Sequence, residues 1–90
     1  NTAEQRKRVI RELIQSLSDE RKRQGVSMNA LASKAGLSQS MVTRLENNPT
    51  NPTLDSLLRI AGVLGVNLGS KLAGAIEKMG IPNTFSPRRQ

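Results

Sequence analysis

The stretch "LASKAGLSQSMVTRLENN", Leu31 to Asn48, decides the fold. A single glycine, Gly36, separates two short segments whose apolar residues recur at helical spacing. Glycine readily adopts the left-handed conformation that ends many helices, and serine is a preferred N-cap residue. Ser27 can cap the first segment and Ser38 the second. The stretch therefore predicts two helices, about 28–35 and 39–47, joined by a tight turn.

Three further helices are predicted outside this stretch. Residues 4–24, 54–65 and 68–79 each carry apolar residues at helical spacing. Gly25, Gly65 and Gly80 follow as terminators, and Thr53 can cap the helix at 54–65. The apolar stripes are Val9, Ile10, Leu13, Ile14 and Leu17; Leu54, Leu57, Leu58, Ala61 and Leu64; and Leu68, Leu72, Ala75, Ile76 and Met79. With no alternating stretch that favours a strand, we expect an all-α domain of five helices.

Composition narrows the function. The chain has 90 residues, no cysteine, no histidine and one aromatic residue, Phe85. Without histidine or cysteine, most catalytic and metal-binding arrangements are disfavoured, so we expect no enzyme activity, no metal and no cofactor. No apolar run approaches the roughly 18 residues of a membrane span, and the start "NTAEQRKR" does not resemble a signal peptide. We therefore expect a cytoplasmic protein that does not bind membranes, with no small-molecule ligand evident.

The net charge of +7 favours an anionic partner. Fourteen basic residues face seven acidic ones, and nine of the fourteen lie in the first half of the chain. Nucleic acid, an anionic membrane surface and an acidic protein all fit such a charge. Simple solubility fits it too, so the charge alone does not choose a partner.

Two short helices joined by a glycine turn form a helix-turn-helix unit. From about Leu13 to Leu72 the chain resembles the lambdoid phage repressor and Cro family, the xenobiotic-response-element (XRE) type of bacterial regulator. The matching residues are Ser27, Leu31-Ala32, Ala35-Gly36-Leu37-Ser38-Gln39-Ser40, Val42, Leu45-Glu46-Asn47, Pro52-Thr53-Leu54, Leu57-Leu58, Ile60-Ala61 and Leu64-Gly65-Val66. The resemblance implies a lambda-repressor-like domain that binds double-stranded DNA and regulates transcription as a repressor or autoregulator.

In such a domain the second helix of the unit lies in the major groove and reads bases near its N-terminus. Gln39, Ser40, Thr43 and Arg44 share one face of the predicted helix 39–47, because residues three and four apart are neighbours. We expect these four to read bases, while Val42 and Leu45 face the core. The alternative is an ordinary solvated polar face.

Phosphate contacts form a second layer. The N-terminus of the helix at 28–35 offers free amide groups to a phosphate. The candidate phosphate-binding residues are Ser27, Asn29, Asn47, Asn48, Thr50 and Asn51. The family commonly has Gln where this chain has Met28, so we expect Met28 to pack rather than bind. The resemblance also implies a structural ion pair between Arg21 and Glu46.

The ends of the chain leave several possibilities open. We expect a basic helical extension at 1–12, the DNA-binding domain at 13–80 and a tail at 81–90. Leu72, Ile76, Met79 and Ile81 are candidates for a homodimer interface, although Leu72 is also expected to pack inward with Leu68. The basic segment "EQRKR" can reach flanking phosphates or remain solvated. Alternatives to a dimeric repressor are a DNA-binding antitoxin that holds a toxin protein, and a helical adaptor that binds protein.

Overall fold

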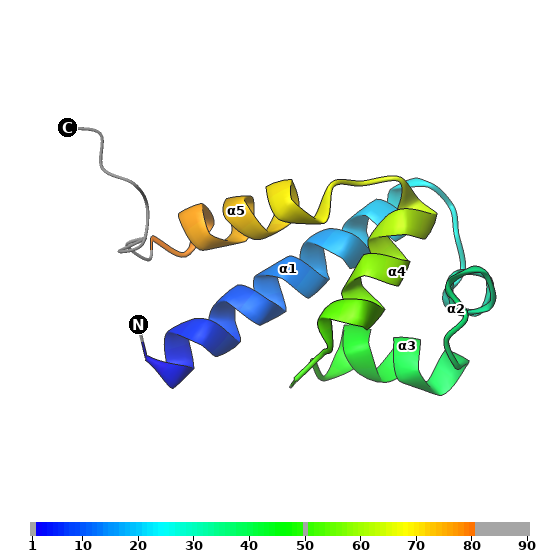
Figure 1. Cartoon of the computed structure of the whole chain (residues 1–90), viewed down its shortest axis with the longest axis horizontal. Helices are drawn as coiled ribbons and strands as arrows, with labels where there is room; N and C mark the ends of the chain where they lie inside the picture. The colour runs from blue at the N-terminus through cyan, green and yellow to red at the C-terminus, as the bar shows by residue number, and fades with distance from the viewer. Residues whose placement is uncertain (1, 50, 81–90) are drawn as a thin grey trace.

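The structure, a computed structural model, describes residues 2–49 and 51–80, and the regular secondary structure among them is entirely α-helix (Figure 1). It contains five helices: α1 (Ala3–Arg23), α2 (Met28–Ala35), α3 (Gln39–Asn47), α4 (Leu54–Leu64) and α5 (Leu68–Lys78). The expectation of an all-α, five-helix domain is confirmed. Every predicted boundary lies within one residue of the observed one, because glycines and capping residues mark the ends so clearly.

Side-chain caps begin all five helices. The hydroxyls of Ser27, Ser38 and Thr53 accept hydrogen bonds from the amides of Ala30, Met41 and Ser56 at 3.0, 3.1 and 3.1 Å. Two caps were not anticipated: Asn67 starts α5, and Thr2 starts α1 in a reciprocal capping box with Gln5. These bonds satisfy amide groups that a helix leaves free in its first turn.

The two glycines that end α2 and α4 need their special conformation. Gly36 and Gly65 have φ values of 72° and 70°, in the left-handed region where a Cβ atom is unfavourable. At Gly36 space is also short, since an added Cβ would lie 3.0 Å from Nη1 of Arg59. That guanidinium donates to the carbonyl of Ala35 at 3.1 Å and so holds α4 against the end of α2.

The core is aliphatic and draws on all five helices. Leu31 and Val42 are its most completely buried large side chains. Around them lie Leu13, Ile14 and Leu17 of α1, Ala32 of α2, Leu57, Ile60 and Leu64 of α4, and Ala75 of α5. Because one residue each of α2 and α3 is sealed at the centre, the two short helices are fixed relative to each other and to α1.

Three leucines of the predicted stripes do not face this core. Leu54 and Leu58 are 65% and 53% exposed, and Leu72, expected to pack inward with Leu68, is 40% exposed. Leu57 and Ile60 occupy the buried side of α4, and Leu54 and Leu58 lie one turn apart at the edge of that side. Helical spacing marks an apolar stripe, but the arrangement of neighbouring helices decides how much of it is covered.

The helices divide the molecule into two parts (Figure 1). α3 and α4 pack at the C-terminal half of α1 and α2 packs on α3 and α4, whereas α5 lies along the other side of α1. An ion pair between Lys78 and Glu12 at 2.9 Å ties α5 to α1 and raises the pKa of Lys78. α1 runs unbroken through residues 12 and 13, as the predicted helix 4–24 does, and the division into an extension at 1–12 and a domain at 13–80 stays a prediction. Among the described residues, no helix is long and apolar enough to cross a membrane.

Candidate nucleic-acid interface

α2 and α3 form a compact unit around the Gly36 turn. The amide of Leu37 donates to the carbonyl of Ala32 at 2.9 Å, and the amide of Gly36 to that of Ser33 at 3.3 Å. These bonds close the end of α2 and direct the chain into the Ser38 cap. Val42 then inserts fully into the core. The orientation of α3 is therefore set by its turn, its cap and its central valine.

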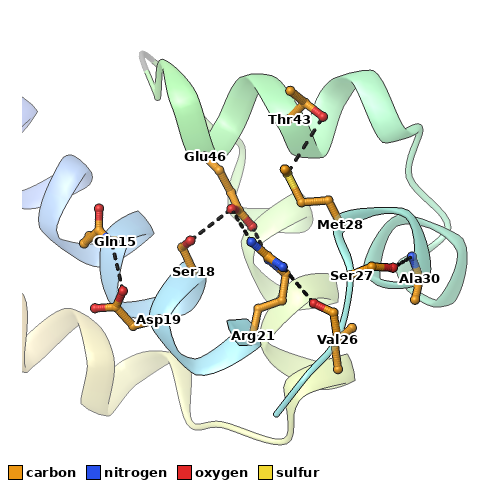
Figure 2. Close-up of polar contacts among 10 residues, drawn as sticks. All are labelled: Gln15, Ser18, Asp19, Arg21, Val26, Ser27, Met28, Ala30, Thr43 and Glu46. Atoms are coloured by element: carbon orange, nitrogen blue, oxygen red, sulfur yellow. Dashed lines mark hydrogen bonds and ion pairs between the residues drawn. The ribbon is translucent and has the colours of Figure 1, made fainter. Parts of the chain in front are cut away.

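A nearly buried ion pair holds the inner side of α3 to α1 (Figure 2). Nε and Nη2 of Arg21 donate to the Glu46 carboxylate at 2.7 and 2.9 Å. Ser18 Oγ donates to the same carboxylate at 2.9 Å, and Nη1 of Arg21 donates to the Val26 carbonyl at 2.7 Å. The Arg21 and Glu46 side chains are only 9% and 12% exposed. This forked geometry neutralises Glu46 and joins the two residues that the resemblance pairs.

The outer side of α3 is polar and open. Gln39, Ser40, Arg44 and Asn47 are all exposed. Ser40 makes one weak contact, 3.3 Å from its Oγ to that of Ser38. The side chains of Gln39, Arg44 and Asn47 form no hydrogen bond or ion pair with any other described residue. Four polar side chains are thus exposed on α3, and three of them have no hydrogen-bond or ion-pair partner among the described residues.

Thr43 differs from the other three candidate base-reading residues. It is half-buried, and its hydroxyl donates to the Met28 sulfur at 3.9 Å (Figure 2). Met28 packs against the core, as expected from the absence of a polar side chain there. The contact places Thr43 at the seam between α2 and α3, on the edge of the exposed face rather than at its centre.

The N-terminus of α2 is exposed and has free amide groups in its first turn. Ser27 is exposed, and its hydroxyl is already used as the N-cap acceptor from Ala30 (Figure 2). Asn29 is exposed beside it. The amides of Met28 and Asn29 have no partner among the described residues, as is usual in the first turn of a helix. These two amides, rather than the Ser27 hydroxyl, are the groups available to a phosphate.

A pocket of about 130 Å³ lies between the end of α3 and the start of α4. Arg44, which was predicted on the helix 39–47, lines this pocket together with Asn48 and Asn51, which were predicted in the loop that follows. Thr50 lies outside the described residues. Two further wall residues, Ser56 and Met41, were not anticipated: Ser56 Oγ accepts from Thr53 Oγ1 at 2.9 Å and donates to the Met41 sulfur at 3.9 Å. In the sequence, the feature that could have indicated the contact between Thr53 and Ser56 was their three-residue spacing at the start of a predicted helix.

The acidic groups near the unit are paired. Asp55 accepts from Arg59 Nε at 2.8 Å. At the end of α1, hydrogen bonds from Arg23 and then Gln24 lower the pKa of Glu20 to about 2. Gln24 Nε2 also donates to the Leu64 carbonyl at 2.7 Å, so this cluster joins α1 to α4. Among the described residues no group of three or more acidic side chains is placed to hold a metal ion.

Comparison with known proteins shows that this chain is similar to helix-turn-helix proteins. A family profile described as Helix-turn-helix matches residues 17–70, more than half of the chain. The chain is 38% identical over 56 residues to an uncharacterized HTH-type transcriptional regulator of Haemophilus influenzae, covering 62% of this chain and 57% of that protein. It is 36% identical over 59 residues to the HTH-type transcriptional regulator SinR of Bacillus subtilis, covering 64% and 53%. The chain spans a little over half the length of these curated relatives.

Proposed function

Because this chain belongs to the helix-turn-helix family of transcriptional regulators, of the Cro/C1 or XRE type, we propose that it is a sequence-specific DNA-binding repressor or autoregulator. The family is one of DNA-binding regulators and not of enzymes. One observation carries the proposal: α3 presents unpartnered polar side chains outward while a nearly buried ion pair fixes its inner side.

Base reading is assigned to the outer face of α3. Gln39 and Ser40 occupy its first turn, and Arg44 follows one turn later. Glutamine can pair with adenine and arginine with guanine in the major groove, each good bidentate contact giving roughly 1–3 kcal/mol of discrimination. Thr43, at the edge of the face, contributes through its methyl group or hydroxyl.

Phosphate binding is assigned to the two ends of the helix-turn-helix unit. At one end are the first-turn amides of α2, with Ser27 and Asn29 beside them. At the other end, exposed Asn47 closes α3, while Asn48 and Asn51 line the pocket next to Arg44. Contacts of this kind set the register of the protein on the duplex and carry no sequence information.

We further propose that the protein acts as a homodimer on a pseudo-palindromic operator. One α3 helix spans few base pairs, and a two-fold dimer reads two half-sites about 34–36 Å apart. Exposed Leu72, with half-buried Ile76 on the same helix and half-buried Met79 just after its last residue, supports an interface on α5. Ile81, a fourth candidate, lies outside the described residues. Sedimentation with and without operator DNA tests this, and Leu72→Ser should weaken any dimer.

The experiment that tests the function is selection of bound duplexes from a random DNA pool. We expect a pseudo-palindromic consensus whose half-sites are one helical turn apart. Failure to enrich any sequence, even at low salt, would refute sequence-specific binding and favour the protein-binding adaptor. Co-purification of a second small protein would instead favour the antitoxin alternative.

A further inference from the structure

The N-terminal half of α1 is a basic surface that the family match does not include. The helix-turn-helix profile begins at residue 17, whereas α1 begins at Ala3. Residues 3–11 contain four cations, Arg6, Lys7, Arg8 and Arg11, against one carboxylate, Glu4. Arg8 and Arg11 share that carboxylate at 3.9 and 3.8 Å, and both pairs are more than half exposed. One charge shared loosely between two arginines leaves a strong positive excess.

This surface belongs to a helix that is capped at its start and tied to α5 along its length. The capping box between Thr2 and Gln5 closes the first turn of α1, with bonds of 3.1 and 2.7 Å. Farther along, the Lys78–Glu12 ion pair and α5 hold the helix from the side opposite α3 (Figure 1). The cations therefore project from a fixed helix and not from a flexible arm, so binding through them costs little ordering of the chain.

Helical spacing places Lys7 on the side of α1 that meets α3 and Arg11 at the edge of that side, where it also lines a surface pocket with Met79. Ser18 and Arg21 define that side, because both donate to Glu46 of α3. Lys7 lies eleven residues before Ser18, and Arg11 seven residues before it; both spacings return to nearly the same side of a helix. In Figure 1 the first turns of α1 lie at the same edge of the molecule as α3, beyond the C-terminal end of α3.

We propose that Lys7 and Arg11 form a second contact with DNA, binding the phosphate backbone outside the half-site that α3 reads. This inference rests on the proposed function. Lys7 is exposed and its ammonium forms no hydrogen bond or ion pair with any other described residue. From Arg21 to Lys7 the helix advances about 21 Å, which corresponds to roughly six base-pair steps of B-DNA. Lys7 and Arg11 would therefore contact the DNA phosphate backbone within a few base pairs of the half-site. Such a contact does not depend on the base sequence.

The test compares two duplexes that share one selected core sequence. The short duplex ends at the half-sites, and the long one carries about ten further base pairs on each side. For the wild type, the slope of log affinity against log salt should be steeper on the long duplex by about two per bound protomer, and so by about four for a homodimer on two half-sites, since each phosphate neutralised adds about 0.9. Two contacts also correspond to about a tenfold larger loss of affinity between ~50 and ~200 mM salt.

Lys7→Gln combined with Arg11→Gln should remove this increment and bind both duplexes with the same salt slope. Lys71→Gln on α5 is the matched control for Lys7→Gln, because it removes one positive charge on the other side of α1. It should leave the difference between the duplexes unchanged. Glu4→Gln, which removes the carboxylate beside Arg11, should steepen the slope on the long duplex only.

The results separate this inference from the proposed function. Wild-type protein that binds the short duplex but gains nothing on the long one would overturn the flanking contact and leave base reading intact. Equal losses from Lys7→Gln and Lys71→Gln would also overturn it, because only net charge would then matter. Circular dichroism of each variant should show the helix content of the wild type. If the Lys7→Gln, Arg11→Gln variant lost the ability to bind phosphatidylserine vesicles but bound both duplexes as the wild type does, the surface would be assigned to a membrane. That result would refute the proposal.

Discussion

The inner and outer faces of α3 treat their polar groups in opposite ways. On the inner face, Glu46 accepts three hydrogen bonds, two from Arg21 and one from Ser18, and is almost sealed from water. On the outer face, Gln39 and Arg44 are exposed and have no internal partner. The inner face fixes where the helix lies, and the outer face is left free to bind.

This difference separates stability from recognition within nine residues. A buried charge that loses its partner is costly, whereas an exposed polar side chain contributes little to folding. Substitutions on the inner face should therefore lower the free energy of unfolding, and substitutions on the outer face should change DNA binding alone. The predictions below test this separation, starting with the largest effect.

The largest effect is expected at the ion pair. Glu46→Ala leaves the Arg21 guanidinium nearly buried without its carboxylate and should lower the free energy of unfolding by about 3–5 kcal/mol. Urea denaturation followed by circular dichroism measures this. Glu77→Ala on the exposed side of α5 is the matched control and should stay within about 0.5 kcal/mol of the wild type. Equal effects of the two substitutions would mean that the Arg21–Glu46 pair contributes no more to stability than an exposed carboxylate does.

The next effect is on the outer face. Arg44→Ala and Gln39→Ala should each relax base preference at defined operator positions, by roughly 1–3 kcal/mol per position. Affinities for single-base variants of the selected duplex measure this. Urea denaturation should show nearly unchanged stability for both variants. If both variants retained the wild-type ranking of bases, the assignment of base reading to α3 would be wrong.

A smaller effect is expected at the turn that joins α2 to α3. Gly36→Ala places a Cβ at positive φ and against Arg59, so it should cost about 1–2 kcal/mol or more of stability. Gly62→Ala is the matched control, because Gly62 lies inside α4 with open space around it. That substitution should stabilise the protein by about 0.5–1 kcal/mol. Similar melting temperatures for the two variants would contradict the strained turn.

The smallest effect concerns Glu20, which joins α1 to α4 through Gln24. Its pKa falls from 4.5 to about 2 because Arg23 and Gln24 donate to its carboxylate. A lowered pKa means that its contribution is present above the ordinary value and is lost as the pH falls toward 2. Melting temperatures of Glu20→Gln and wild type should therefore differ slightly at neutral pH and converge in acid. A difference in melting temperature that became larger in acid would contradict the lowered pKa of Glu20.

Much of the fold could be predicted from the sequence because the signals are local. Gly36 and Gly65 end helices, and Ser27, Ser38 and Thr53 begin them, so boundaries follow from single residues. Leu54, Leu58 and Leu72 could not be placed in this way. Their burial depends on how α4 and α5 lie against α1, and that arrangement arises from tertiary packing rather than from spacing.

The candidate site was predicted as a set of positions, not as an arrangement. Spacing placed Gln39, Ser40, Thr43 and Arg44 on one face, but it did not show that Thr43 turns toward Met28. Nor did it show that Arg44 shares a pocket with Asn48 and Asn51. Both depend on contacts between helices. The roles of these residues in DNA binding stay predictions.

The most direct test of the central claim is amide chemical-shift mapping of the full chain with a selected duplex. If the outer face of α3 is the reading surface, the largest shifts should fall on Gln39 to Asn47 and on the first turn of α2. Amides along α5 that face away from α3 should change little at a fixed state of association. Large shifts confined to α4 and α5, with α3 unchanged, would contradict the account.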